Sequence, residues 1–274
     1  MFESQISLAW PSGNSDVKPL NRQQAVTAYV PAAWTKIDAM TVARFKDLCM
    51  DAVDALSQAR FWASVLGASP VDRGDGSARL APVPGRSSGE VVWIDPVPEP
   101  RTVKTRVHLD LRLAEAGPAI ILRAGATVVR EPGDNPWWVL ADPEGNEFCV
   151  FPPKSEDAPP PGVFELVVEC RDAWAQASWW AEITGGNAKR SDEGAFAWVE
   201  EAAGFPWQYW VFAEVPEPKV VKNRMHWDVD LIGPGPEALV AAGAVVLRER
   251  GGDIRWWVLA DPEGNEFCAF PPGE

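Results

Sequence analysis

The stretch Trp137–Cys149 reads WWVLADPEGNEFC, and the same thirteen letters return at Trp256–Cys268. Each copy continues to Phe-Pro-Pro, and the similarity extends upstream with nearly the same offset. The upstream matches are VPEP at 97–100 and 215–218, RVHLDL at 106–111 against RMHWDV at 224–229, and FWASVLG at 61–67 against WWAEITG at 179–185. A period of about 118 residues is far longer than that of a solenoid repeat, so the chain contains a duplicated domain.

The repeat sets the domain boundaries. We predict an N-terminal arm at 1–41, a first domain at 42–153, a linker at 154–161 and a second domain at 162–274. The stretch PPKSEDAPPPG around the linker is rich in proline and charge, which is typical of a semi-stiff solvated connection.

Composition narrows the class of protein. The 274 residues carry a net charge of −14, from 25 basic and 39 acidic side chains. Such a charge disfavours binding to nucleic acid. The sequence contains neither an apolar run long enough to span a membrane nor a recognisable signal peptide, and its four cysteines suggest no disulfide framework. We therefore expect a reduced, cytoplasmic protein. Its 15 tryptophans indicate either bulky cores or aromatic cavities.

Each copy has the pattern of two βαβββ modules, the second less regular than the first. Alternating residues at 45–53 and 163–171 predict half-buried strands, and helices are expected at 55–66 and 173–184. Asp54 and Asp172 are suited to cap these helices, and Gly67 and Gly185 to end them. Further strands are expected at 90–95 and 208–213, around His108 and His226, at 137–140 and 256–259, and at 147–151 and 266–270.

Side-chain alternation carries the functional argument, because successive side chains of a strand point to opposite faces. One parity of the first copy is apolar and should pack under the helices: Leu48, Met50, Leu109, Leu111, Phe148 and Val150. The other parity is polar: Asp47, Cys49, Asp51, His108, Asp110, Arg112, Glu147 and Cys149. The second copy repeats this parity with Glu165, Glu169, His226, Asp228, Asp230 and Glu266. Unpaired carboxylates are costly inside a core, so the polar face indicates a site.

These features resemble the glyoxalase-like domains of the vicinal-oxygen-chelate superfamily, which includes glyoxalase I, extradiol dioxygenases and bleomycin-resistance proteins. The resemblance rests on the paired βαβββ pattern, the FW…LG helix, the R-x-H-x-D strand and the DPEGNEF hairpin. It covers both copies. It implies an α+β fold in which two βαβββ modules form a U-shaped mixed sheet around a ligand cleft, with the helices on the convex side.

The resemblance also implies a divalent metal, which could be Fe, Mn, Ni, Zn or Mg. The implied ligands are Asp47, His108 and Glu147 in the first copy and Glu165, His226 and Glu266 in the second. Asp51 and Glu169 are candidate general bases beside it. The family usually has His or Gln on the first strand, so Asp47 and Glu165 depart from its pattern. Each histidine could equally be a structural residue that is hydrogen-bonded to the neighbouring acid.

A second set of residues could bind the ligand itself. The candidates are Trp93, Arg106, Trp138, Trp210, Arg224 and Trp257. The indoles could stack on a flat molecule, and the arginines could bind a carboxylate or form ion pairs with nearby acids.

Two functions remain open at this point. The first is a metal-dependent lyase, isomerase or dioxygenase acting on a small oxygenated molecule. The second is a metal-free protein that sequesters an aromatic antibiotic, and an acidic cleft would favour a cationic one. A small-molecule ligand is the expected partner in both cases. The two copies can complete one another as a pseudo-dimer, so we expect a monomer.

Overall fold

The computed structural model describes residues 41–83, 85–153, 161–192 and 194–273. The expected arm 1–41 and linker 154–161 lie outside this range, apart from Thr41 and Pro161. The first copy contains β1 (Ala43–Ala52), α1 (Ala55–Leu66), β2 (Ser69–Asp72), β3 (Ala78–Ala81), the short 3₁₀ helix η2 (Ser88–Glu90), β4 (Val92–Pro96), β5 (Val107–Arg112), α2 (Ala119–Ala124), β6 (Thr127–Arg130), β7 (Trp138–Ala141) and β8 (Glu147–Phe151). The second contains β9 (Gly162–Cys170), α3 (Ala173–Thr184), β10 (Asn187–Arg190), β11 (Phe196–Glu200), β12 (Tyr209–Glu214), β13 (Met225–Leu231), α4 (Glu237–Ala241), β14 (Val245–Arg248), β15 (Trp257–Ala260) and β16 (Glu266–Phe270).

The two long helices have the bounds and caps that the sequence predicts. Asp54 accepts a hydrogen bond from the backbone N–H of Ser57 at the start of α1, and Asp172 accepts one from Ala175 at the start of α3. Each cap satisfies an N–H group that has no partner within the helix. Both helices end at a glycine in the left-handed conformation, where a side chain would be strained.

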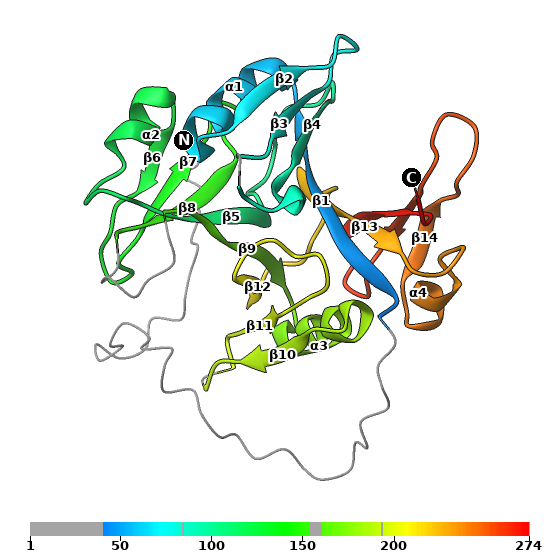
Figure 1. The fold of residues 1–274 in the computed structure, drawn as a ribbon. Helices are drawn as coiled ribbons and strands as arrows, with labels where there is room; N and C mark the ends of the chain where they lie inside the picture. The colour runs from blue at the N-terminus through cyan, green and yellow to red at the C-terminus, as the bar shows by residue number, and fades with distance from the viewer. Residues whose placement is uncertain (1–40, 84, 154–160, 193, 274) are drawn as a thin grey trace. The chain divides into compact units, whose positions relative to one another are not determined.

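The strands form two mixed sheets of eight, and each sheet takes half of its strands from each copy (Figure 1). The first sheet has the order β14-β15-β16-β13-β1-β4-β3-β2, and the second has the order β10-β11-β12-β9-β5-β8-β7-β6. The expected α+β fold class with tandem two-module domains is confirmed. The modules pair across the copies: β1 lies antiparallel to β13, and β5 lies antiparallel to β9.

Edge strands explain why this pairing is needed. In every module the first strand is bonded to the last, which leaves one edge of the first strand unpaired within the module. Unpaired strand edges expose backbone N–H and C=O groups and are prone to aggregation. The four such edges satisfy one another in two antiparallel pairs, which tie the copies together.

The DPEGNEF hairpin has a structural role in holding each copy together. The buried carboxylate of Asp142 accepts hydrogen bonds from Gln58 (2.7 Å) and Trp62 (3.3 Å) of α1 and from the side chain and backbone of Asn146. Asp261 binds Gln176, Trp180 and Asn265 in the same way. Each Asp therefore fixes the hairpin of the second module to the helix of the first.

The main core lies between the sheets and the helices and is rich in indoles. Trp180, Trp210 and Trp227 are fully buried against one another, with ring centroids 4.8 to 5.2 Å apart. Phe45 of the first copy packs edge-on against Trp210 of the second at 5.7 Å. The backbone of Phe45 also lies against Gly204, where a Cβ atom would come within 2.1 Å of its carbonyl oxygen. The apolar side chains that the strand alternation places under the helices, including Leu48 and Leu109, are buried in this core.

Within the part of the chain that the structure describes, no helix combines the length and the hydropathy needed to cross a bilayer.

We predict that Asp142→Ala lowers the free energy of unfolding by about 2–4 kcal/mol, because it leaves several buried donors without an acceptor. Urea unfolding followed by circular dichroism would measure the change. Glu115→Ala, which alters an exposed carboxylate, is the matched control and should have little effect. A loss for Asp142→Ala no larger than that of the control would contradict the structural role of this residue.

Candidate functional site

The cross-copy pairing regroups the predicted site residues. Asp47 lies on β1 in the first sheet, whereas His108 and Glu147 lie on β5 and β8 in the second. The expectation that these three residues meet is therefore wrong. Asp47 instead shares a sheet with His226 and Glu266, and Glu165 shares one with His108 and Glu147. All six lie on the face of their sheet that carries no helix, which we call the helix-free face.

On the first sheet, a cluster of His, Asp and Cys side chains gathers around the β1–β13 pair. Cys49 is the cross-strand partner of His226, and Asp47 is the partner of Asp228, which is in turn the partner of Cys268 on β16. The Cys49 thiol donates to Asp228 Oδ2 at 3.4 Å, and Cys268 Sγ lies 3.6 Å from His226 Nε2. His226 Nε2 lies 3.8 Å from Asp228 Oδ1. We call Cys49, His226, Asp228 and Cys268 the thiol cluster.

Two buried carboxylates oppose each other beside the thiol cluster. Asp47 is 7% and Asp228 is 5% exposed. Burial, followed by the nearby charge of Asp47, raises the pKa of Asp228 well above its usual range. Burial also raises the pKa of Asp47, partly offset by a 3.0 Å hydrogen bond from the Trp93 indole. Like charges directly opposite one another destabilise a sheet, and the raised pKa of Asp228 together with its hydrogen bond to Asp47 favours a proton held between the two carboxylates.

The second sheet carries a similar but smaller cluster. His108 Nε2 lies 3.4 Å from Asp110 Oδ1 and 3.7 Å from Cys149 Sγ. The cross-strand partner of His108 is Val167, at the position that corresponds to Cys49. The second cluster therefore has one thiol where the first has two.

Both imidazoles are neutral at pH 7. Burial, aided by the positive charge of Lys104, lowers the pKa of His108 to about 4, and burial with Lys222 lowers that of His226 to about 3. Neutral imidazole is the form that binds metals or accepts hydrogen bonds.

The carboxylates of the last strands are already paired with basic side chains. Glu147 forms an ion pair with Arg101 and accepts a 2.8 Å hydrogen bond from the backbone N–H of Thr105. Glu266 pairs with Lys219 at 2.6 Å and accepts from the backbone of Asn223. Each glutamate is therefore neutralised by a basic side chain and belongs to neither group of His, Asp and Cys side chains that could hold a metal. The metal set implied by the family resemblance does not fit these residues as the protein holds them.

The two candidate bases are also ion-paired, in each case across the copies. Asp51 contacts Lys222, and Glu169 lies 2.8 Å from Lys104. Burial raises the pKa of both carboxyl groups, and the lysines partly offset this effect. Their contacts tie one copy to the other, which gives both residues a structural role.

The predicted arginines join the copies as well. Arg106 donates to the carbonyl oxygens of Glu217 (3.0 Å) and Glu169 (3.2 Å). Arg224 donates to the carbonyl of Glu99 (2.8 Å) and to the Glu144 carboxylate (2.9 Å). These contacts give both arginines a structural role between the copies.

Of the four predicted tryptophans, only Trp93 lies on a helix-free face, as the cross-strand partner of Cys49. Trp210 is wholly buried in the main core. Trp138 is the cross-strand partner of Val150, and Trp257 is the partner of Ala269. Both partners belong to the apolar side of the sheet, so these two tryptophans face the helices. The structure gives no support for a ligand role of Trp138 or Trp210, whereas Trp257 lines an open pocket with Val240, Val246 and Glu249.

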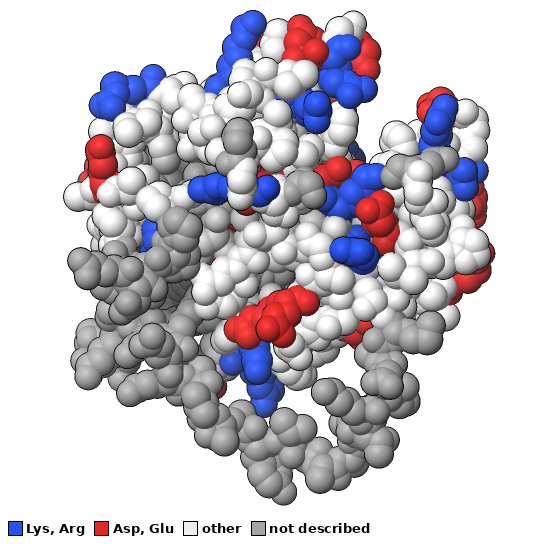
Figure 2. Space-filling model, in the orientation of Figure 1, with Lys and Arg blue, Asp and Glu red and all other residues white. Residues whose placement is uncertain are grey.

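Charge compensation differs among the carboxylates of the helix-free faces. Asp51, Glu147, Glu169 and Glu266 are paired with lysines or arginines, whereas the opposed carboxylates of Asp47 and Asp228 interact mainly with each other. On the face of the molecule in Figure 2, red and blue side chains lie next to one another at several places.

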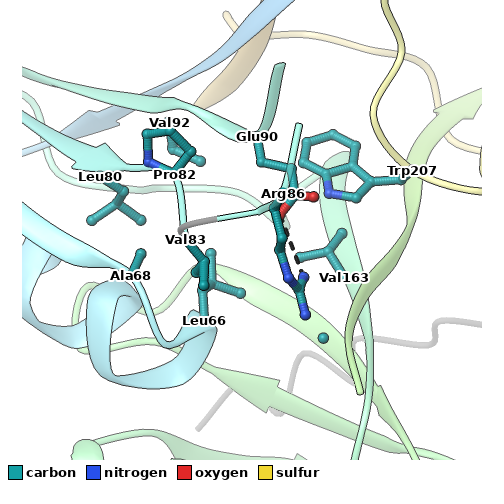
Figure 3. A pocket seen from close by; sticks show the side chains of 11 residues that line it. Leu66, Ala68, Leu80, Pro82, Val83, Arg86, Glu90, Val92, Val163 and Trp207 are labelled. Atoms are coloured by element: carbon teal, nitrogen blue, oxygen red, sulfur yellow. Dashed lines mark hydrogen bonds and ion pairs between the residues drawn. The ribbon is translucent and has the colours of Figure 1, made fainter. Parts of the chain in front are cut away.

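A shallow pocket lies away from both histidine clusters (Figure 3). Its walls come from α1, β3, β4 and the start of β9, with Trp207 on one side. Arg86 crosses it, pairs with Glu90 at 3.4 Å and donates to the carbonyl of Pro161 at 3.0 Å. The remaining lining is mostly aliphatic, so this pocket offers packing between the copies and no catalytic group.

Comparison with known proteins identifies the family. A model described as a glyoxalase-like domain matches the chain twice, at residues 47–151 and 165–270. The chain therefore belongs to the glyoxalase-like domain family, and the resemblance to the vicinal-oxygen-chelate superfamily is confirmed.

Solved structures share the fold. Glyoxalase I from Zea mays is similar with a TM-score of 0.60 and 15% identity, over 83% of this chain and 92% of that one. A putative dioxygenase from Bacillus subtilis subsp. subtilis str. 168 has a TM-score of 0.50 and 13% identity, over 85% and 87% of the two chains. Likeness at this level of identity establishes the fold alone. No curated protein sequence matches the chain.

Sequence reasoning missed several residues that the structure brings together. The sequence analysis places Cys49 on the polar face of its strand but does not bring it next to His226 and Asp228, which lie across the strand pair from it, or near Cys268 on β16. Trp198 on β11 was not considered, although Phe196, Trp198 and Glu200 alternate with smaller apolar residues. The repeat offset would also have aligned Trp210 with Val92, a core position, and not with Trp93.

We predict that neither histidine titrates between about pH 5.5 and 8 in metal-free protein, because both pKa values lie well below the usual 6.5. The unfolded chain binds these protons more readily, so this contribution to stability is present above about pH 6.5 and is lost as the pH falls. Imidazole ¹⁵N NMR would measure both, since the chain has only two histidines. A midpoint near pH 6.5 for either would contradict the burial.

Proposed function

We propose that the protein binds a small molecule with a flat apolar body and a polar oxygen group on the helix-free face of the second sheet. The observation that carries this proposal is a row of cross-strand partners that runs Trp198–Val211–Val167–His108 across β11, β12, β9 and β5. On one face of the sheet, this row therefore places an aromatic surface, which we call the aromatic wall, next to the cluster of His108, Asp110 and Cys149.

The aromatic wall is distinct from the main core. Val167, Trp198 and Val211 form a separate apolar cluster, against which Phe196 and Tyr209 pack. The Trp198 ring lies 6.1 Å from that of Phe196 and 6.3 Å from that of Tyr209. Val167, Trp198 and Val211 are themselves buried, so a flat ligand on this face would first meet the half-buried rings of Phe196 and Tyr209 that pack on them.

The polar half of the same face supplies the hydrogen-bonding groups. His108 is neutral, and its Nδ1 atom is buried without a hydrogen-bond partner in the described part of the chain. Asp110 and Cys149 lie next to its Nε2 atom. A ligand hydroxyl or carbonyl placed at the imidazole would gain a hydrogen bond, while its apolar body would lie on the wall.

The ion pairs on Glu147 and Glu266 favour binding over the Lewis-acid reaction that was expected at the predicted ligand set. We therefore propose the binding function ahead of a lyase, isomerase or dioxygenase reaction. The proposed ligand needs no positive charge, unlike the cationic antibiotics considered from the sequence. The expectations of a monomer and of no nucleic-acid partner stay predictions.

We predict that Trp198→Ala weakens binding of a cognate aromatic ligand at least tenfold, because it removes most of one wall of the site. A thermal-shift screen of hydroxylated and carbonyl-bearing aromatic compounds would find binders, and isothermal titration calorimetry would give their affinities. Trp93→Ala on the first sheet is the matched control and should leave binding unchanged. Binding that is lost in Trp93→Ala and kept in Trp198→Ala would place the ligand on the other sheet, and the absence of any binder would contradict the proposal.

A further inference from the structure

A pocket lies on the helix-bearing side of the first sheet, between α4, β14 and Trp257 of β15. It has a volume of about 580 Å³ and is open to solvent. Cavities that bind small molecules usually measure about 300–1,000 Å³, so this pocket has room for a ligand. It lies on the opposite side of the sheet from the thiol cluster and shares no residue with either histidine cluster.

Most of the lining of this pocket is apolar. Val240, Ala241 and Val246 contribute aliphatic side chains, and Val240 is 44% exposed. Trp257 is half-buried, and its Nε1 atom donates a 3.1 Å hydrogen bond to Glu249 Oε2, which fixes the orientation of the indole. An oriented indole beside aliphatic side chains gives the apolar part of a ligand a surface to pack on.

The charged groups in the lining are both carboxylates. Glu237 and Glu249 are exposed, and the described residues that line the pocket include no lysine, arginine or histidine. An ammonium group is attracted both to carboxylates and to the face of an indole. We therefore propose that this pocket binds a small organic cation in which an apolar group carries an amine. The proposal does not depend on the ligand of the second sheet.

Arg250 provides independent support for a cation at this indole. It does not line the pocket, but its guanidinium carbon lies 5.5 Å from the centroid of the Trp257 ring. This distance is within the range of a cation–π contact. The other arginine nearby, Arg248, is paired with Asp253. The Trp257 ring thus already attracts a positive charge from the protein, and a ligand ammonium would make the same kind of contact.

The first copy supplies an internal comparison. At the repeat offset of 118 residues, Ala119 stands in place of Glu237 and Arg123 stands in place of Ala241, while the other glutamate of the lining has a glutamate as its counterpart. Two glutamates give the pocket a formal charge of −2, whereas one glutamate and one arginine give the corresponding positions of the first copy a charge of 0. We therefore expect one cation site per chain, beside Trp257.

The test titrates the full chain with phenethylamine, which is positively charged at pH 7, and with phenethyl alcohol as the matched uncharged probe. In ¹⁵N-HSQC spectra we expect the amine to shift the indole N–H signal of Trp257, which is assigned with Trp257→Phe. The alcohol should bind about fivefold more weakly, because it lacks the charge. No shift of this signal by the amine, or equal affinity for the alcohol, would overturn the proposal.

Two arginine variants of α4 locate the site. Ala241→Arg copies Arg123 of the first copy into the lining and should weaken amine binding about tenfold. Ala238→Arg adds the same charge to an exposed position of α4 outside the lining and should change binding less than about twofold. Equal weakening by both variants would show a general effect of charge and would contradict the site.

A further pair of variants keeps the test decisive if Ala241→Arg does not fold. Glu237→Ala copies Ala119 of the first copy and should weaken amine binding about threefold, because one carboxylate is lost. Trp198→Ala on the aromatic wall should leave amine binding unchanged. Loss of amine binding in Trp198→Ala but not in Glu237→Ala would place the amine on the second sheet and overturn this proposal alone.

Discussion

The pairing of β1 with β13, and of β5 with β9, is the constraint on which the rest of the structure depends. Each pair joins the unpaired edge of a module from one copy to that of a module from the other. Because every helix-free face then contains strands of both copies, neither copy can build a site alone. The same pairs bring Lys222 to Asp51 and Lys104 to Glu169, so ion pairs across the copies strengthen the arrangement.

The duplicated halves have diverged on the faces where function would lie. The hairpins, helix caps and buried Asp142 and Asp261 are the same in both copies, since these parts only have to hold the fold. The two helix-free faces differ instead: one presents two thiols beside a histidine, and the other presents an aromatic wall beside a histidine. Selection for two separate roles would produce this pattern, whereas two identical sites would keep both faces alike.

Much of the fold could be predicted from local sequence. The caps at Asp54 and Gly67 define α1 to the residue, and strand alternation correctly separates Leu48 and Met50 from Asp47 and Cys49. The choice of strand partner could not be predicted, because the copies carry similar edge strands and the local hydrogen bonding would be alike in either arrangement. The ion pair between Glu147 and Arg101 could not be predicted either, because the two residues are 46 positions apart and local sequence does not show that a loop brings them together.

The most direct test of this account is a set of long-range backbone NOEs in an isotope-labelled chain. The account predicts contacts between Leu48 on β1 and Trp227 on β13, and between Leu109 on β5 and Leu166 on β9. Contacts between Leu48 and Leu109 in place of these would show that each copy closes its own sheet. In that case neither the thiol cluster nor the row from Trp198 to His108 would exist, because both depend on strand pairs between the copies.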